Sequence, residues 1–228
     1  MSDQSDPPVN GRLEARLSGY RYGVVLLLLL ATFLFLTAGL SGKWVPLVTV
    51  VLEGATLLAA LAAARARRRL VRLATLVVAG GLVSGTLAVL LGTDPRGEIF
   101  LLNALLIGAA PVVIAESILR RKVIDLRTVL GAICIYILIG MVWASLYSAM
   151  GALDSRPFFD QIEKQETTTA DYLYFSYVTQ TTVGYGDLTA ARNVGRALAV
   201  LEALIGQLYL VTVVALLVGR LGPGRLQR

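Results

Sequence analysis

The sequence contains no histidine and only one cysteine, Cys134. Without histidine the chain lacks the commonest general base and metal ligand, and one thiol cannot form a disulfide within the chain. Charged residues are also scarce, at 16% of the 228 residues against roughly 25% in soluble domains. We therefore expect neither a zinc site nor an enzyme, and the composition argues against a soluble globular or disordered protein.

Long apolar runs are what the sequence does contain. Hydrophobic residues make up 56% of the chain before its 22 glycines are counted. A bilayer core about 30 Å thick needs about 20 apolar residues per helix, and the gaps between charges leave room for six such helices. The sequence therefore predicts an all-α membrane protein. Its spans lie near 24–40, 44–64, 73–91, 99–119, 129–150 and 197–219.

The basic residues gather on one side of these spans. Fifteen of the 21 lysines and arginines fall in the tails and loops on the side of the N-terminus, including a cluster at 65–72. Positively charged loops remain in the cytoplasm, so we expect a multi-pass plasma-membrane protein with both termini cytoplasmic. The net charge of +6 then reflects orientation, and no nucleic-acid partner is expected. Membrane lipids are the expected surroundings, with Arg220, Arg225 and Arg228 placed to contact anionic lipid.

Three acidic residues interrupt the predicted spans, where an ionised side chain is costly unless it faces protein. Glu116 precedes Arg120 by one helical turn, and an ion pair between them explains it. Glu53 lies in the middle of the second span, where either a structural hydrogen bond or a functional role accounts for it. Glu202 lies in the sixth span, and we expect it to face protein.

An unusual segment separates the fifth and sixth spans. A polar stretch at 155–169 is followed by an aromatic-rich segment at 171–181, which is too short to cross a bilayer. Thr168, Thr169 or Asp171 suits the start of a helix there. The next residues read Thr-Val-Gly-Tyr-Gly-Asp at 182–187. A half-helix that re-enters the membrane fits this pattern better than a spanning helix.

The stretch at 182–187 resembles the selectivity filter of the potassium-channel pore family. The likeness extends to its setting over 123–219, which has an outer helix, a pore helix, the filter and an inner helix in order. The resemblance implies passive transport of K⁺, with no cofactor beyond K⁺ ions bound in the filter. Because one chain supplies one loop and a ring of carbonyls needs four, it also implies a homotetramer.

The resemblance gives each filter residue a role. The backbone carbonyls of Thr182, Val183, Gly184 and Tyr185 would bind K⁺, and the Thr182 hydroxyl would close the innermost site. Glycine readily adopts positive φ. We therefore expect Gly184 and Gly186 to adopt it and so turn successive carbonyls toward one axis.

Residues around the filter are expected to support it. Tyr185 would turn away from the ions and pack against an aromatic collar of Tyr174, Phe175 and Tyr177, while Asp187 ends the motif.

The pore helix departs from the family pattern at one position. In well-known members of the family, an acidic residue braces the filter where this chain has Val178. Glu202 would take over part of that bracing, packing behind the pore helix of its own or a neighbouring subunit, near Thr179 or Gln180.

The resemblance also assigns residues of the inner helix. Gly206 falls at the usual hinge position, although a glycine there is equally explained by close packing. Gln207 would face a water-filled cavity under the filter. Val214 and Val218 would line the cytoplasmic mouth and gate it by dewetting.

Six spans with a pore after the fifth is the layout of voltage-gated cation channels, whose fourth helix carries regularly spaced basic residues. Span 99–119 contains none, so we expect no steep voltage dependence.

The predicted parts are a tail at 1–22, a four-helix domain at 23–122 and a pore domain at 123–228. Within the pore domain we expect helices at 128–151, 171–181 and 194–219. The alternative is a membrane sensor or scaffold whose pore does not conduct.

Overall fold

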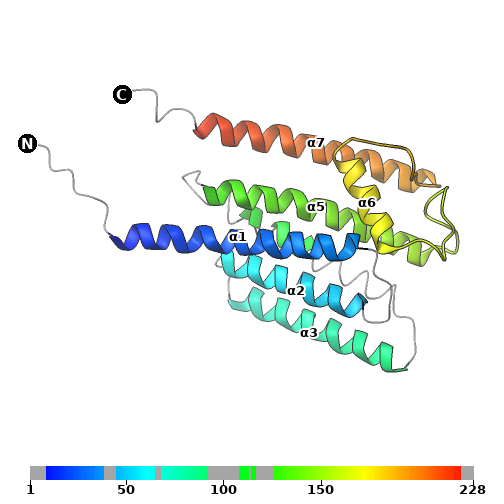
Figure 1. Cartoon of the computed structure of the whole chain (residues 1–228), viewed down its shortest axis with the longest axis horizontal. Coiled ribbons are helices and arrows are strands. Elements are labelled where there is room, and N and C mark those ends of the chain that lie inside the picture. The colour runs from blue at the N-terminus through cyan, green and yellow to red at the C-terminus, as the bar shows by residue number, and fades with distance from the viewer. Residues whose placement is uncertain are drawn as a thin grey trace, which may run out of the picture.

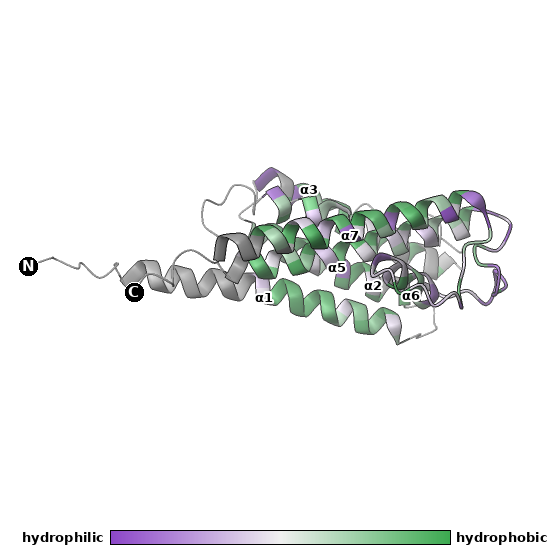
Figure 2. Cartoon of the chain, turned by 90° about the horizontal axis from the view of Figure 1, so that it is seen from above, coloured by the Kyte–Doolittle hydropathy of each residue, from purple (hydrophilic) through white to green (hydrophobic). Residues whose placement is uncertain are grey.

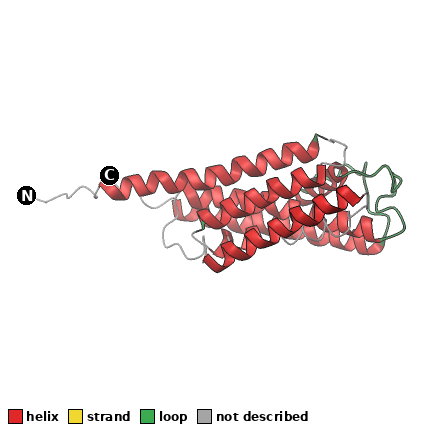
Figure 3. Cartoon of the chain, turned by 90° about the horizontal axis from the view of Figure 1, so that it is seen from below, coloured by secondary structure: helices red, strands yellow, loops and turns green. Residues whose placement is uncertain are grey.

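The computed structural model describes residues 9–38, 45–64, 68–91, 108–112, 114–116 and 126–221, and this part of the chain is helical without a β-strand (Figures 1 and 3). The all-α prediction is therefore confirmed for these residues. The helices are α1 (Val9–Thr37), α2 (Val45–Ala63), α3 (Arg68–Leu91), α5 (Leu126–Leu153), α6 (Thr169–Gln180) and α7 (Asn193–Leu221).

The helix bounds differ from the predicted ones mainly at the N-terminus. The first helix begins at Val9, well inside the predicted tail at 1–22, because a charged segment can continue a helix beyond the apolar run that suggested it. The helices α5, α6 and α7 lie within two residues of their predicted bounds. Of the fourth span, only 108–112 and 114–116 are described, and both are helical. The rest of that span lies outside the described residues.

Hydropathy along the helices supports a membrane protein. Thr128–Leu153 and Asn193–Val213 are long and apolar enough to cross a bilayer, while Tyr22–Thr37, Val48–Ala63 and Val71–Val83 are apolar but shorter. Figure 2 shows apolar residues along most of the described helices, with polar residues at the end that holds the α5–α6 loop and at the start of α3. Two spans are thus supported by length and composition, and six remain a prediction.

The helices pack in two groups that share α1. The helices α1, α2 and α3 lie side by side in chain order, and α1 also packs against α5 and α6 (Figure 1). A continuous apolar core joins the groups and includes Val25, Leu29, Leu57 and Leu138, together with the thiol of Cys134. The short helix α6 lies between α5 and α7 and contacts both.

Candidate functional site

The short helix α6 begins at a well-formed cap. The Thr168 amide donates to Oδ2 of Asp171 over 2.7 Å, and the Asp171 amide donates back to the Thr168 hydroxyl. Such a capping box satisfies two amides that have no partner inside a helix. With 12 residues, the helix is about 18 Å long, well short of a bilayer crossing. The predicted half-helix is therefore present, with Thr168 as its cap.

Polar side chains fix α6 against α5. The Tyr177 hydroxyl donates to the Ile137 carbonyl over 2.6 Å, and the Gln180 amide donates to the Tyr136 carbonyl over 2.9 Å. A close approach makes these bonds possible, because a Cβ atom on Gly140 would lie 2.4 Å from Oε1 of Gln180. Glycine at this point of α5 thus lets the two helices come into direct contact.

The backbone after α6 alternates in handedness. Thr182, Gly184 and Gly186 have φ values of 59°, 56° and 79°, and among the described residues no other position has positive φ. Alternating left- and right-handed residues turn successive peptide groups toward the same side. The positive φ expected at Gly184 and Gly186 is confirmed. Thr182 was missed, because threonine adopts this conformation at a cost of roughly 1–2 kcal/mol and no sequence pattern indicates it.

The amides of this segment attach it to the end of α6. The Val183 amide donates to the Val178 carbonyl over 3.0 Å, and the Gly184 amide donates to the same oxygen over 3.3 Å. The Thr182 amide donates to the Thr179 carbonyl over 2.9 Å. Val178 thus contacts the segment through its backbone, in place of the carboxylate that the family pattern has there.

The three aromatic residues of the predicted collar have different partners within the chain. Tyr174 donates to Oδ2 of Asp187 over 2.6 Å, and this bond raises the pKa of Tyr174 to about 12, so that the phenol stays a neutral donor. Phe175 instead packs with Phe158 and Phe159 of the preceding loop, and Tyr177 packs edge-on against Phe33 of α1. Packing of the three aromatic residues against Tyr185 stays a prediction.

The loop before α6 is joined to the segment after the filter motif. Phe159 and Ala190 form an antiparallel bridge, and the Asp160 amide donates to the Thr189 carbonyl over 3.1 Å. Two exposed ion pairs span the same contact: Asp160 with Arg196 at 3.1 Å, and Asp154 with Arg192. The polar loop before α6 is therefore bonded to the segment that follows the filter motif.

Glu202 is completely buried behind α6 and bonds to two helices. The Tyr147 hydroxyl of α5 donates to its Oε2 over 2.7 Å, and the Ser176 hydroxyl of α6 lies 2.5 Å from its Oε1. The Ser176 hydroxyl also lies 2.7 Å from the Gly140 carbonyl of α5. We call Glu202, Ser176, Tyr147 and the Gly140 carbonyl the Glu202 network.

The expected position of Glu202 behind α6 is confirmed, although its partners were not foreseen. The sequence suggested Thr179 or Gln180, one turn further along α6. A serine and a tyrosine inside apolar helices were the available signal, since a buried acid needs donors.

Two adjacent residues of α7 contact the end of α6 and the first residue of the filter motif. A Cβ atom on Gly206 would lie 2.5 Å from the Gln180 carbonyl oxygen, so the close-packing explanation for this glycine has direct support and the hinge stays a prediction. The Gln207 amide donates to the Thr182 hydroxyl over 3.0 Å. Val214 and Val218 lie within α7, but their side chains lie outside the described residues.

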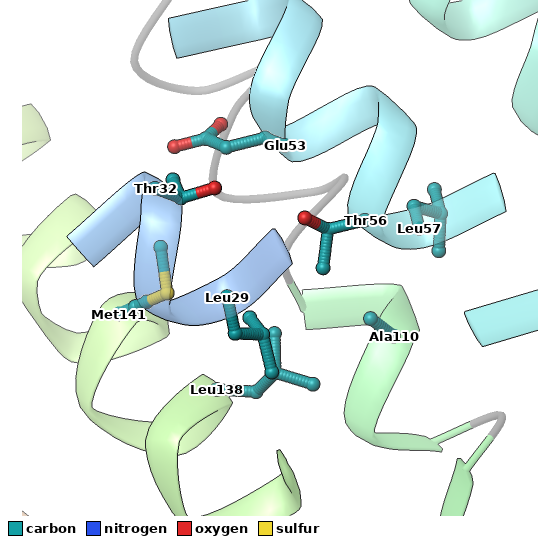
Figure 4. Close-up of a pocket in the computed structure, with 8 residues that line it drawn as sticks. All are labelled: Leu29, Thr32, Glu53, Thr56, Leu57, Ala110, Leu138 and Met141. Atoms are coloured by element: carbon teal, nitrogen blue, oxygen red, sulfur yellow. The ribbon is translucent and has the colours of Figure 1, made fainter. Parts of the chain in front are cut away.

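The second buried acid, Glu53, lies in the first helix group. Its side chain borders a cavity of about 10 Å³ between α1, α2 and α5, beside Thr32 and Thr56 (Figure 4). Both threonine hydroxyls donate to carbonyls of their own helices. Among the described residues, no group forms a hydrogen bond with Oε2 of Glu53. The structural hydrogen bond expected for this residue is therefore not found at that oxygen.

Comparison with known proteins agrees with this geometry. Residues 131–222 match a family model described as an ion channel. The matched region contains nearly all of α5, the polar loop, α6, the filter motif and α7. No curated protein and no solved structure matches the chain. The match and the apolar helices together support a membrane protein with an ion-channel pore and point to ion transport as its function.

Proposed function

We propose that the chain forms a K⁺-selective channel that transports K⁺ passively across the plasma membrane as a homotetramer. The observation that carries the proposal is the backbone at 182–186. Its φ values alternate in sign, and the amides of 182–184 are bonded to the end of α6. With the N–H groups directed to α6, the carbonyls are free to face the opposite side.

Carbonyl oxygens on one side of a loop suit a dehydrated cation. Four copies of the loop around an axis would give rings of oxygens that replace the water shell of K⁺. The carbonyls of Thr182, Val183, Gly184 and Tyr185 would supply the rings, and the Thr182 hydroxyl would complete the innermost one. The bond from Gln207 to that hydroxyl then fixes the oxygen at the cavity end of the pore.

The single chain leaves uncovered the surfaces that a tetramer would bury. Residues 181–187 are exposed, including Tyr185 with 72% of its surface accessible. On α7, Leu201, Leu204 and Leu208 are exposed as well. Only 17% of the span in α7 is buried within the chain, against 44% of the span in α5. A helix uncovered beside an uncovered filter is the arrangement expected of an inner helix that packs against neighbouring subunits.

Orientation and gating follow from the charges. The excess of basic residues on one side favours a cytoplasmic location for both termini, where the C-terminal arginines would lie near anionic lipid. Because the fourth span contains no basic residue, the four-helix domain should not respond steeply to voltage. A conductance that follows voltage with more than about two gating charges per subunit would contradict this part of the proposal.

The test is ion flux through the full chain reconstituted in lipid vesicles. We expect K⁺ flux well above Na⁺ flux, and block by Ba²⁺. The variant Gly184→Ala should abolish selective flux because alanine is strained at φ 56°, whereas Gly80→Ala in α3, with open space around it, serves as the matched control. Equal Na⁺ and K⁺ flux would contradict selectivity. Vesicles with assembled protein and no flux would favour the sensor or scaffold alternative.

A further inference from the structure

The Glu202 network connects three helices through one carboxyl group. Glu202 belongs to α7, Ser176 to α6, and Tyr147 and Gly140 to α5. The side chains of Glu202, Ser176 and Tyr147 are fully buried. Because Ser176 lies only two residues before Val178, whose carbonyl accepts from the Val183 and Gly184 amides, the network holds the same turn of α6 to which the filter motif is attached.

The network has three short oxygen–oxygen contacts but only two hydroxyl protons. Oxygen pairs at 2.5 Å, 2.7 Å and 2.7 Å join Glu202 to Ser176, Glu202 to Tyr147, and Ser176 to the Gly140 carbonyl. Each short oxygen–oxygen contact needs one proton between its atoms. Serine and tyrosine supply one proton each, and neither a carbonyl nor an ionised carboxylate supplies any. A third proton is required, and only the carboxyl group can carry it.

The surroundings contain no charge that would offset an ionised carboxylate. Among the described residues, no ion pair includes Glu202, and the titratable groups that face it are phenols. These are Tyr147 and Tyr136 of α5 and Tyr177 of α6. A buried carboxylate without a cation is costly in a low-dielectric site. The surroundings and the proton count therefore both indicate that the carboxyl group of Glu202 is protonated.

We propose that Glu202 is a positioning residue that works as a neutral carboxylic acid. Its Oε1–H group donates to the Ser176 hydroxyl, which then donates to the Gly140 carbonyl, while Tyr147 donates to Oε2. If the acid ionised, Ser176 would have to turn its proton to Glu202 and release Gly140. The proton therefore maintains the bond from Ser176 of α6 to the Gly140 carbonyl of α5 while Ser176 stays bonded to Glu202 of α7, and so helps to hold the filter motif in place. The effect on conduction rests on the proposed channel function.

Infrared spectroscopy tests the protonation state without relying on conduction. The purified full-length protein at neutral pH should show the C=O stretch of a protonated buried carboxyl group. This signal should be lost in Glu202→Gln and retained in Glu53→Gln, which controls for the other buried acid. A spectrum that Glu202→Gln leaves unchanged would overturn the proposal, whether or not the protein conducts K⁺.

Flux measurements test the positioning role. Glutamine preserves the pattern of a neutral acid, because its amide can donate to Ser176 while its carbonyl accepts from Tyr147. We expect Glu202→Gln to keep K⁺ flux within about twofold of the natural protein, and Glu202→Leu to reduce it about tenfold or more. Flux of the natural protein should also fall as the pH rises from about 7 to about 10, and this fall should vanish in Glu202→Gln.

Two results would reject the positioning role. One is a Glu202→Gln variant as impaired as Glu202→Leu, which would mean that the negative charge is needed. The other is an alkaline loss of flux that persists in Glu202→Gln, which would assign it to the phenols. Natural protein with the carboxyl signal but without K⁺ flux would instead refute the proposed channel function and leave the protonation state established.

Discussion

The two buried acids of the described helices have opposite surroundings. Glu202 has a partner for each carboxyl oxygen, drawn from α5 and α6. Glu53 is 5% exposed, and its Oε2 has no hydrogen-bond partner among the described residues. An intramembrane acid is costly in both places, yet only Glu202 offsets that cost with bonds that hold other helices. The comparison suggests that polar groups organise the pore side of the molecule, and that apolar packing holds the first helix group.

The largest expected effect separates the two acids directly. Glu202→Leu leaves the Tyr147 hydroxyl buried without a partner and should destabilise the protein by about 3 kcal/mol. Glu53→Leu removes an unsatisfied oxygen and should be neutral or stabilising by about 1 kcal/mol. Thermal unfolding of the purified protein in detergent measures both. Equal destabilisation by the two substitutions would show that the acids play the same role.

The second effect concerns glycines. Gly206→Ala would place a methyl group 2.5 Å from the Gln180 carbonyl oxygen, and a backbone atom cannot easily move aside. We expect a loss of about 1–3 kcal/mol. In contrast, Gly80→Ala has open space and should stabilise α3 by about 1 kcal/mol through helix propensity. Unfolding midpoints that rise for both variants would mean that α6 and α7 do not need this close approach.

The third effect concerns the bond from Tyr174 to Asp187. Tyr174→Phe should lower sustained K⁺ flux about two- to fivefold, because the end of the filter motif loses a donor. Since the pKa of Tyr174 is raised from 10.0 to about 12, the bond is present below pH 10 and is lost as the pH rises through about 12. Tyr136→Phe is the control, because the buried Tyr136 hydroxyl has no hydrogen-bond partner among the described residues and its removal should cost nothing. Unchanged flux in Tyr174→Phe would show that this bond does not support the filter.

The smallest effect lies in the exposed loop. Arg196→Gln removes the ion pair with Asp160 and a bond to the Ala190 carbonyl. Exposed pairs contribute about 0–1 kcal/mol and are screened by salt. Any destabilisation should therefore shrink between low and high ionic strength. A large loss of stability that does not change with salt would show that the loop contact behaves like a buried hydrogen-bond network and not like an exposed ion pair.

Sequence reasoning anticipated the features that depend on local chemistry. Apolar runs between charges gave α5 and α7 to within four residues, and Thr168 was one of three candidate caps. Positive φ at two glycines followed from their missing side chains. The burial of Glu202 followed from the cost of a charge in lipid.

Features that depend on how the helices pack against one another could not be predicted from the sequence. Partners of Glu202 depend on the rotation of α6 about its axis, which no local pattern reveals. The same rotation sets the partners of Phe175 and Tyr177, which are Phe158 and Phe159 for the first and Phe33 for the second. Positive φ at Thr182 lets the amides of 182–184 donate to the Val178 and Thr179 carbonyls. These acceptors are in place only once α6 has formed.

The attachment of three successive amides to the last turn of α6 makes the filter motif a continuation of that helix. The direction in which the carbonyls of the motif point therefore depends on the rotation of α6 about its own axis. Adding one residue inside α6 would rotate its end by about 100° and swing the carbonyls away from the axis, even with every residue of 182–187 intact. In the proposed channel, the length of α6 would therefore matter as much for selectivity as the motif that follows it.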